Sequence, residues 1–118
     1  MLRGEIRLVD FDPVTGVSGS QHDQRRAAVI VSNDSANSAA ARLGQGVVTV
    51  VPLTSNLERV HPFQVLLKAG ETGLSRDSKA QAEEVRSVAV DRLGARVGVV
   101  PPSVLRRLDD ALRLHLSL

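Results

Sequence analysis

The sequence predicts a mainly β fold of the α+β class: a small barrel or curled sheet of antiparallel strands, packed by one late helix. Short apolar runs rich in Val and Leu alternate with turns that carry glycine or proline, which is typical of strands. Near the C-terminus, leucines recur at helical spacing. With 118 residues, 42% of them hydrophobic and 24% charged, we expect a single domain spanning residues 1–118.

The first half of the chain predicts three strands. Residues 4–11 alternate imperfectly, which indicates a strand with one buried face, ended by Asp12-Pro13. Residues 14–24 lack periodicity and predict a long loop. The uniformly apolar run 27–31 predicts a strand buried on both faces. Two further assignments follow: 33–41 is expected to be a loop with at most one helical turn, and 47–53 a strand whose end or bulge is marked by Pro52.

The second half predicts shorter strands and the helix. Residues 62–67 form a fourth strand, and 68–77 a polar turn region. A fifth strand covers 78–82 and 85–90, bent or interrupted at Glu83-Glu84, and a last strand covers 96–100. The helix spans 101–115, with Pro102 in its first turn. Its apolar stripe is expected to comprise Leu105, Leu108, Leu112 and Leu116.

Composition narrows the function classes. The absence of cysteine excludes disulfides and thiol metal sites and fits a reducing cytoplasm. Charges at positions 3, 5 and 7 argue against a signal peptide, and no apolar run approaches the ~18 residues of a membrane span. The isoelectric point near 9.9 favours an anionic partner, although an arginine-rich solvated surface explains it equally well. Phe11 and Phe63 are the only Phe, Tyr or Trp residues, which argues against a stacking platform for several bases.

Arg25 and Arg26 stand directly before the buried run 27–31. A guanidinium presents a planar fork of donors that matches a phosphate, and a buried strand would hold it rigidly. Two interpretations remain open from these residues alone: a phosphate site, or a solvated strand end.

Other chemistry is weakly indicated. Of three histidines, only His22 lies near these arginines, where a catalytic role competes with a solvated loop position. Asp10 and Asp12 flank Phe11 without a third ligand, and no metal-binding or nucleotide-binding motif occurs. We therefore expect no metal and no cofactor.

Several segments in order carry a family resemblance: GEIRLVDFDPVTG, RRAAVIVSND, VVPLTSN, HPFQVLL, AQAEEVRSV and ALRLHLSL. Together they resemble the MazF/PemK family of bacterial toxin endoribonucleases nearly end to end, apart from a longer first loop. The resemblance implies an SH3-like (CcdB/MazF-like) barrel with a C-terminal helix, and a homodimer. It also implies metal-independent cleavage of single-stranded RNA, leaving 2′,3′-cyclic phosphate and 5′-OH ends and inhibiting translation and growth. A cognate antitoxin of the MazE type, whose flexible tail covers the RNA groove, would inhibit it.

The resemblance also implies two catalytic residues. The family's arginine opens the second strand, which corresponds to Arg26, here followed by Ala27 in place of the usual proline. The family's threonine lies two residues after a strand-ending proline, which corresponds to Thr54 after Pro52. A fixed guanidinium beside a donating hydroxyl would stabilise negative charge on a phosphoryl group attacked by a 2′-OH. The group that takes the 2′-OH proton is not identified.

Other positions are expected to bind substrate. Phe11 stacks on a base or packs in the core, and Arg25 contacts a backbone phosphate or is solvated. Glu84 stands where the family usually has glutamine, so base preference is expected to differ. For Arg86, a dimer contact or a core ion pair is favoured over RNA. In the first loop, Gln21, His22 or Asp23 replaces a family Ser-Glu pair. The full set of expected substrate-binding residues is Phe11, Asp12, Gln21, Arg25, Ser55 and Glu84.

Two alternatives stay open. The same barrel is shared by a toxin that inhibits DNA gyrase by binding, which would not need Arg26 and Thr54. A family member with a decayed site could act only as an antitoxin sink. The recognition sequence, and the choice among mRNA, rRNA and tRNA as target, are not indicated by the sequence.

Overall fold

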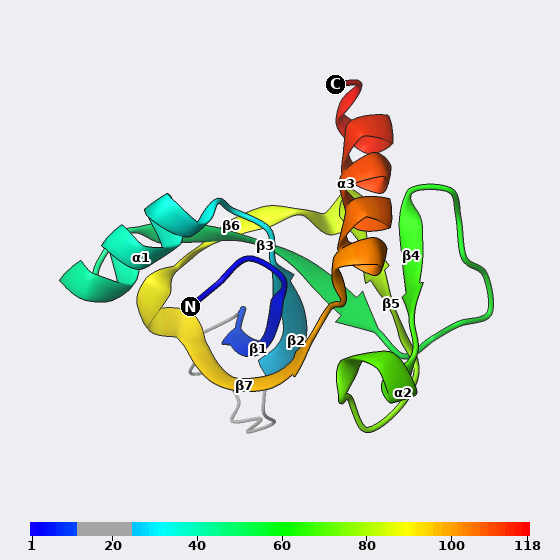
Figure 1. Cartoon of the computed structure of the whole chain (residues 1–118), viewed down its shortest axis with the longest axis horizontal. Helices are drawn as coiled ribbons and strands as arrows, with labels where there is room; N and C mark the ends of the chain where they lie inside the picture. The colour runs from blue at the N-terminus through cyan, green and yellow to red at the C-terminus, as the bar shows by residue number, and fades with distance from the viewer. Residues whose placement is uncertain (12–24) are drawn as a thin grey trace, which may run out of the picture.

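The computed structural model describes residues 1–11 and 25–118. The chain forms an antiparallel sheet and ends in a C-terminal helix (Figure 1). The sheet order is β4-β5-β3-β2-β1-β7, and β6 also pairs with β3. The strands are β1 (Glu5–Asp10), β2 (Arg25–Ile30), β3 (Val47–Thr54), β4 (Gln64–Leu67), β5 (Ser78–Gln81), β6 (Arg86–Ala89) and β7 (Leu93–Val99). The helices are α1 (Asp34–Leu43), α2 (Ala69–Thr72), α3 (Pro102–Leu116) and the single 3₁₀ turns η2 (Ala82–Glu84) and η3 (Val90–Arg92). The predicted class, a mainly antiparallel β fold with a C-terminal helix, is confirmed.

Strand β3 is the centre of the sheet. Residues Val47 to Val50 of β3 pair with β6. On the other edge of β3, Val50 to Pro52 pair with β2. Its last two residues, Leu53 and Thr54, pair with β5. Pro52 was expected to end this strand or mark a bulge, but the strand continues to Thr54. Pro52 lies after the last pair with β6 and before the first pair with β5, at Leu53, and such a gap tolerates a residue that lacks an N–H.

Two apolar cores lie on the two faces of the sheet. One packs against α3 and contains Val29; the other packs around β6 and α1 and contains Ala28 and Ile30. The prediction that β2 is buried on both faces is therefore confirmed for residues 28–30, all 0% exposed. The single buried face expected for residues 4–11 is wrong. Ile6 and Val9 are both fully buried, one in each core, because residues three apart on a strand point to opposite faces and both faces of β1 are covered.

The loop expected at 33–41 is instead the ten-residue helix α1. Its start is capped by Asn33, whose Oδ1 accepts a hydrogen bond from the N–H of Ala36 at 2.8 Å. Its end is closed by Gly44 at φ 68°, a conformation that favours glycine. The alanines between these caps have the highest helix propensity, so two caps and a good helix former outweigh the loop-like serines and asparagines.

The remaining elements refine the prediction. The break at Glu83-Glu84 is confirmed, since η2 separates β5 from β6. The polar turn region contains the short helix α2, and β7 begins three residues earlier than expected, at Leu93. Helix α3 buries Val104, Leu108 and Ala111, with the expected Leu116 47% exposed, so its buried face is rotated from the leucine stripe. In the part of the chain that is described, no helix has the length and apolar character to cross a bilayer.

Candidate active site

Arg26 lies near the start of β2, where the second core opens to solvent. Its Nη2 donates to the carbonyl oxygen of Leu53 at 3.0 Å and to Oε1 of Gln81 at 3.2 Å. Both acceptors are neutral, and no carboxylate pairs with Arg26 among the described residues. The guanidinium is thus fixed on one side through a single nitrogen. Its Nε and Nη1 have no acceptor within residues 1–11 and 25–118, and its positive charge is not neutralised there.

Thr54 lies beside Arg26 at the end of β3. The pairing of β2 with β3 ends at Ala28 and Pro52, two residues away from Arg26 and Thr54 along their strands. Arg26 also bonds the carbonyl of Leu53, which is one peptide away. The Thr54 Oγ1 accepts a hydrogen bond from the N–H of Asn56 at 3.2 Å. With that acceptor position in use, the hydroxyl proton is left to donate elsewhere.

Phe11 follows β1 and lies between two cations. Its ring centroid is 5.7 Å from the guanidinium carbon of Arg26 and 4.9 Å from that of Arg86. Phe11 also packs, partly buried, against the second core. The two roles weighed for this ring, core packing and contact at the site, are therefore compatible. Arg86 is exposed and forms no ion pair with the described residues, so the dimer contact or core ion pair expected for it stays a prediction.

The structure brings some expected residues together and leaves others apart. Arg25 is exposed in β2, paired with Asp10 across the ladder, and Ser55 is exposed directly after Thr54. Glu84 is exposed at the end of η2 and bonds to neither Arg26 nor Thr54. The expectations for Asp12, Gln21, His22 and Asp23 fall outside the described residues.

Gln81 contacts Arg26 and Lys79 lies opposite Thr54, and the sequence indicated neither relation. Both lie in β5, which pairs with the end of β3 and so faces Arg26 and Thr54. The one available signal was a polar residue, Gln81, between the small apolar Ala80 and Ala82 in an expected strand. This signal indicates a residue near Arg26 only when the order of the strands in the sheet is known.

The two remaining histidines lie elsewhere. His61 stacks on Phe63 with ring centroids 5.1 Å apart, and His115 lies 6.4 Å from the same ring. No cluster of three or more potential metal ligands occurs in the described ranges.

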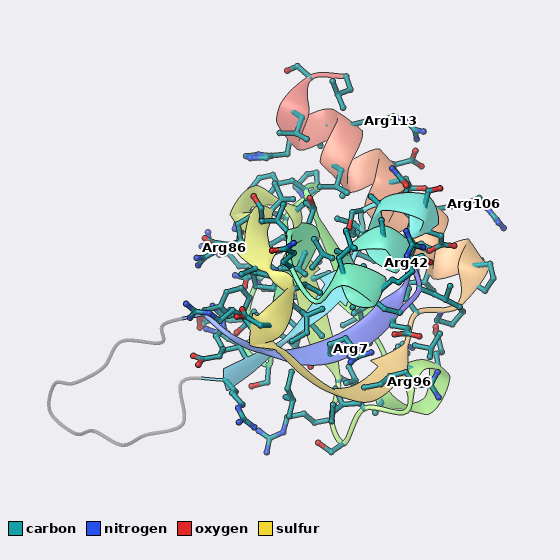
Figure 2. All side chains as sticks on the ribbon, turned by 90° about the vertical axis from the view of Figure 1, so that its left-hand side faces the viewer. Arg7, Arg42, Arg86, Arg96, Arg106 and Arg113 are labelled. Carbon is teal, nitrogen blue, oxygen red and sulfur yellow. The ribbon has the colours of Figure 1, made fainter. Side chains whose placement is uncertain are left out.

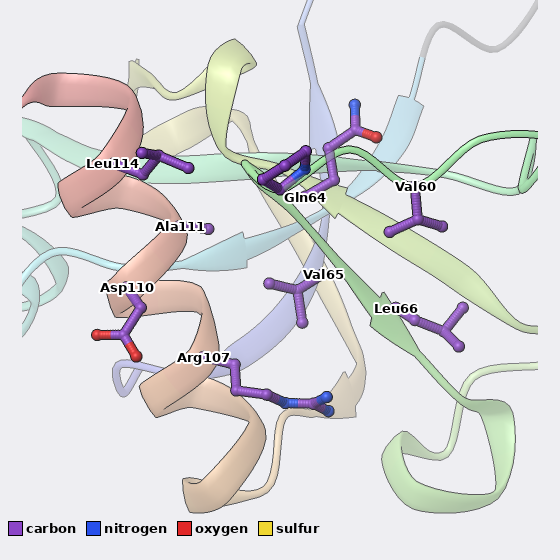
Figure 3. A pocket seen from close by; sticks show the side chains of 9 residues that line it. Val60, Gln64, Val65, Leu66, Arg107, Asp110, Ala111 and Leu114 are labelled. Carbon is purple, nitrogen blue, oxygen red and sulfur yellow. The ribbon is translucent and has the colours of Figure 1, made fainter.

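Two cavities lie among the described residues away from Arg26 and Thr54. A shallow pocket of about 240 Å³ adjoins Phe11 and is also lined by Asp10, Arg86 and Arg92. A larger pocket of about 420 Å³ lies between β4 and α3, lined by Val65 and Leu114 among others (Figure 3). Arg26 and Thr54 line neither of these two pockets. The arginines labelled in Figure 2 point out on several sides of the molecule, so positive charge alone does not mark the site.

Comparison with known proteins gives the family of the chain. The family model described as "PemK-like, MazF-like toxin of type II toxin-antitoxin system" matches residues 2–116. The chain is 56% identical over 118 residues to Endoribonuclease MazF9 of Mycobacterium tuberculosis, covering 100% of this chain and 98% of that protein.

Solved structures give the same result for the fold. An endoribonuclease in complex with its cognate antitoxin, from a mycobacterial species, superposes with a TM-score of 0.76 at 24% identity, covering 100% of this chain and 96% of that one. The Mycobacterium tuberculosis toxin MazF-mt6 gives 0.73 at 21% identity, with 97% of each chain covered. The antiparallel sheet with its C-terminal helix is the fold of these solved structures, and the family match over residues 2–116 gives the class, a MazF-like toxin. The chain belongs to the family of PemK-like, MazF-like toxins of type II toxin–antitoxin systems.

Proposed function

We propose that this protein is an endoribonuclease toxin that cleaves single-stranded RNA without a metal ion. The observation that carries the proposal is the state of Arg26: one nitrogen is held by two neutral acceptors, and its other donors have no acceptor among the described residues, close to Thr54. A relative of 56% identity bears the name endoribonuclease, which supports the same activity. The gyrase alternative gives no reason for this arrangement.

The proposed reaction needs only the substrate's own nucleophile. The 2′-OH oxygen attacks the adjacent phosphorus and forms the O2′–P bond, while the P–O5′ bond breaks. The proton lost by the 2′-OH goes to a base, and the departing O5′ gains one. The products carry a 2′,3′-cyclic phosphate and a 5′-OH, so no water or metal enters this step.

Arg26 and Thr54 stabilise charge in this proposal. Negative charge grows on the phosphoryl oxygens in the transition state. The donors we assign to it are the Nε–H and Nη1–H of Arg26, which have no acceptor among residues 1–11 and 25–118. The Thr54 hydroxyl donates beside them. Because Arg26 is already oriented by Leu53 and Gln81, little reorganisation is needed as the charge develops. Arg26 also lies next to the leaving oxygen and assists its departure.

Other partners follow the family. We propose that the active form is a homodimer in the bacterial cytoplasm and that an antitoxin of the MazE type blocks the RNA surface. A neighbouring structure, titled as an endoribonuclease with its cognate antitoxin, supports the second part. Phe11, Arg25 and Ser55 lie within the same region and are proposed to contact RNA, whereas Glu84 is assigned only to base preference.

The activity is tested on a long single-stranded RNA in EDTA. We expect discrete cuts whose 5′ ends accept a kinase label without prior dephosphorylation, and no cut where the nucleotide before the scissile phosphate is 2′-deoxy. Arg26→Ala and Thr54→Val should each lower the rate by about 10²–10³-fold, as for loss of one preorganised donor. The matched controls are Arg106→Ala, an exposed arginine on α3, and Thr49→Val, on the same strand as Thr54.

Controls that cleave at the wild-type rate exclude a general effect of charge or of threonine loss. Cleavage that needs a divalent ion, or that persists in both site variants, would contradict the assignment. Intact RNA combined with inhibition of purified gyrase would favour the binding toxin instead.

A further inference from the structure

Lys79 is a buried lysine beside the candidate site that no step of the proposed reaction uses. It lies in β5 with 7% of its surface exposed, although lysine is among the residues least often buried. The register sets it directly opposite Thr54. Opposite residues in an antiparallel pair project from the same face, so the Lys79 stem lies alongside the Thr54 side chain.

The Lys79 side chain is bound to a loop, not to an acid. Its Nζ donates to the carbonyl oxygen of Arg59. In the described part of the chain, no carboxylate lies within ion-pair distance of it. Burial of a cation costs free energy that one neutral acceptor does not offset, so the stability of the fold does not explain this residue.

The bond to Arg59 closes a ring of contacts around the loop 55–59. The Thr54 Oγ1 accepts from the N–H of Asn56 at 3.2 Å, and Asn56 Oδ1 accepts from the N–H of Glu58 at 3.1 Å. The next carbonyl, that of Arg59, is tied to Lys79, which pairs with Thr54 across the strands. The loop is therefore held to the sheet at both ends.

We propose that Lys79 is a positioning residue for the Thr54 hydroxyl. By tying the Arg59 carbonyl to β5, it keeps the Asn56 N–H on Thr54 Oγ1, and this leaves the hydroxyl proton directed at the phosphate. Lys79 does not touch RNA. The inference rests on the proposed function, because it assigns Lys79 a part in the same reaction.

The test compares the same substitution at the only two lysines of the chain. Lys79→Met removes the ammonium and keeps the stem; Lys68→Met removes an exposed ammonium from the end of β4. We expect Lys79→Met to lower kcat about 10- to 100-fold with KM changed less than about 2-fold, as for a displaced catalytic group. Its Tm should stay the same or rise, since apolar replacement of a buried charge is often neutral or stabilising. Lys68→Met should behave as wild type.

A double-mutant cycle separates positioning from a general effect. In a Thr54→Val background, Lys79→Met should cause no further loss of kcat, because the hydroxyl it positions is gone. Amide hydrogen exchange reports the loop without any activity: the Asn56 and Glu58 N–H groups should exchange faster in Lys79→Met, while β3 and β5 amides keep their protection.

Additive losses in the double variant, or unchanged exchange at Asn56 and Glu58, would overturn the proposal, as would a lower Tm with unchanged kcat. If the wild-type chain cleaves no RNA, the proposed function fails on its own, and the exchange measurement still decides whether Lys79 holds the loop.

Discussion

Gln81 gives the sharpest test of how Arg26 works, because the variant Gln81→Glu changes one atom and adds one charge. Gln81 Oε1 accepts from Arg26 Nη2 at 3.2 Å. A carboxylate there keeps the hydrogen bond but neutralises the guanidinium that the reaction needs. It also places a negative charge near the phosphate: two hydrogen bonds of about 3 Å, one on each side of the guanidinium, separate the two anions by about 6–7 Å.

The size of the effect follows from Coulomb's law. At an effective dielectric constant of about 40, between a protein surface and water, charges about 6.5 Å apart repel by about 1.3 kcal/mol, or nearly tenfold in rate. We expect Gln81→Glu to cleave about tenfold more slowly under single-turnover conditions. The loss should shrink as salt rises from about 0.05 to 0.5 M, because exposed charges are screened.

The matched control is Gln45→Glu, which adds the same charge at an exposed turn. Gln45 precedes the first residue of β3, whereas Thr54 is the last residue of that strand. It should cleave within about twofold of wild type at every salt concentration. A Gln81→Glu protein as active as wild type, or one whose loss is independent of salt, would refute the view that Arg26 acts through its net charge.

Three further substitutions test the ring and the fold. Phe11→Leu keeps an apolar side chain on the second core but removes the ring that lies near two guanidiniums. The rate of RNA cleavage should fall about 3- to 30-fold, while the Tm falls by less than about 5 °C. A lower Tm with an unchanged cleavage rate would contradict a role at the site. Gly98→Ala should lower the unfolding free energy by about 1–3 kcal/mol in urea titration, because its Cβ would meet a carbonyl oxygen at 2.7 Å; Gly70→Ala, with open space, should be neutral or stabilising. Asn33→Ala should lower the Tm by about 3–5 °C through loss of the α1 cap, and no shift would show that the cap contributes nothing.

The strands were predictable where an apolar run is continuous, and less so where distant segments bury the second face of an alternating strand. The run 27–31 was identified as buried on both faces because five apolar residues occur in a row. Ile6 and Val9 lie on opposite faces of β1, and each face is covered by residues from distant segments, which no pattern within β1 reveals. Helix α1 was missed because serine and asparagine favour loops in isolation, and only the geometry of Asn33 and Gly44 shows that they cap a helix.

The residues of the candidate site also differ in whether the sequence could predict them. Arg26 and Thr54 were proposed from the order of motifs, and that assignment stays a proposal. Gln81 and Lys79 could not be found, because their relation to the site is set by the pairing of β5 with β3. A sequence shows which residues neighbour each other along a strand, but not which strand lies beside it.

The central position of β3 has a consequence for when this protein can act. Arg26 reaches its two anchors across sequence separations of 27 and 55 residues. Both contacts require β2 and β5 to have paired on opposite edges of β3, which are long-range events that form late and together in a folding chain. A nascent or partly unfolded toxin therefore lacks the oriented guanidinium altogether. We expect its activity to appear only when the sheet has formed completely. Activity is then coupled to cooperative folding, and it should be lost when either β2 or β5 separates from β3.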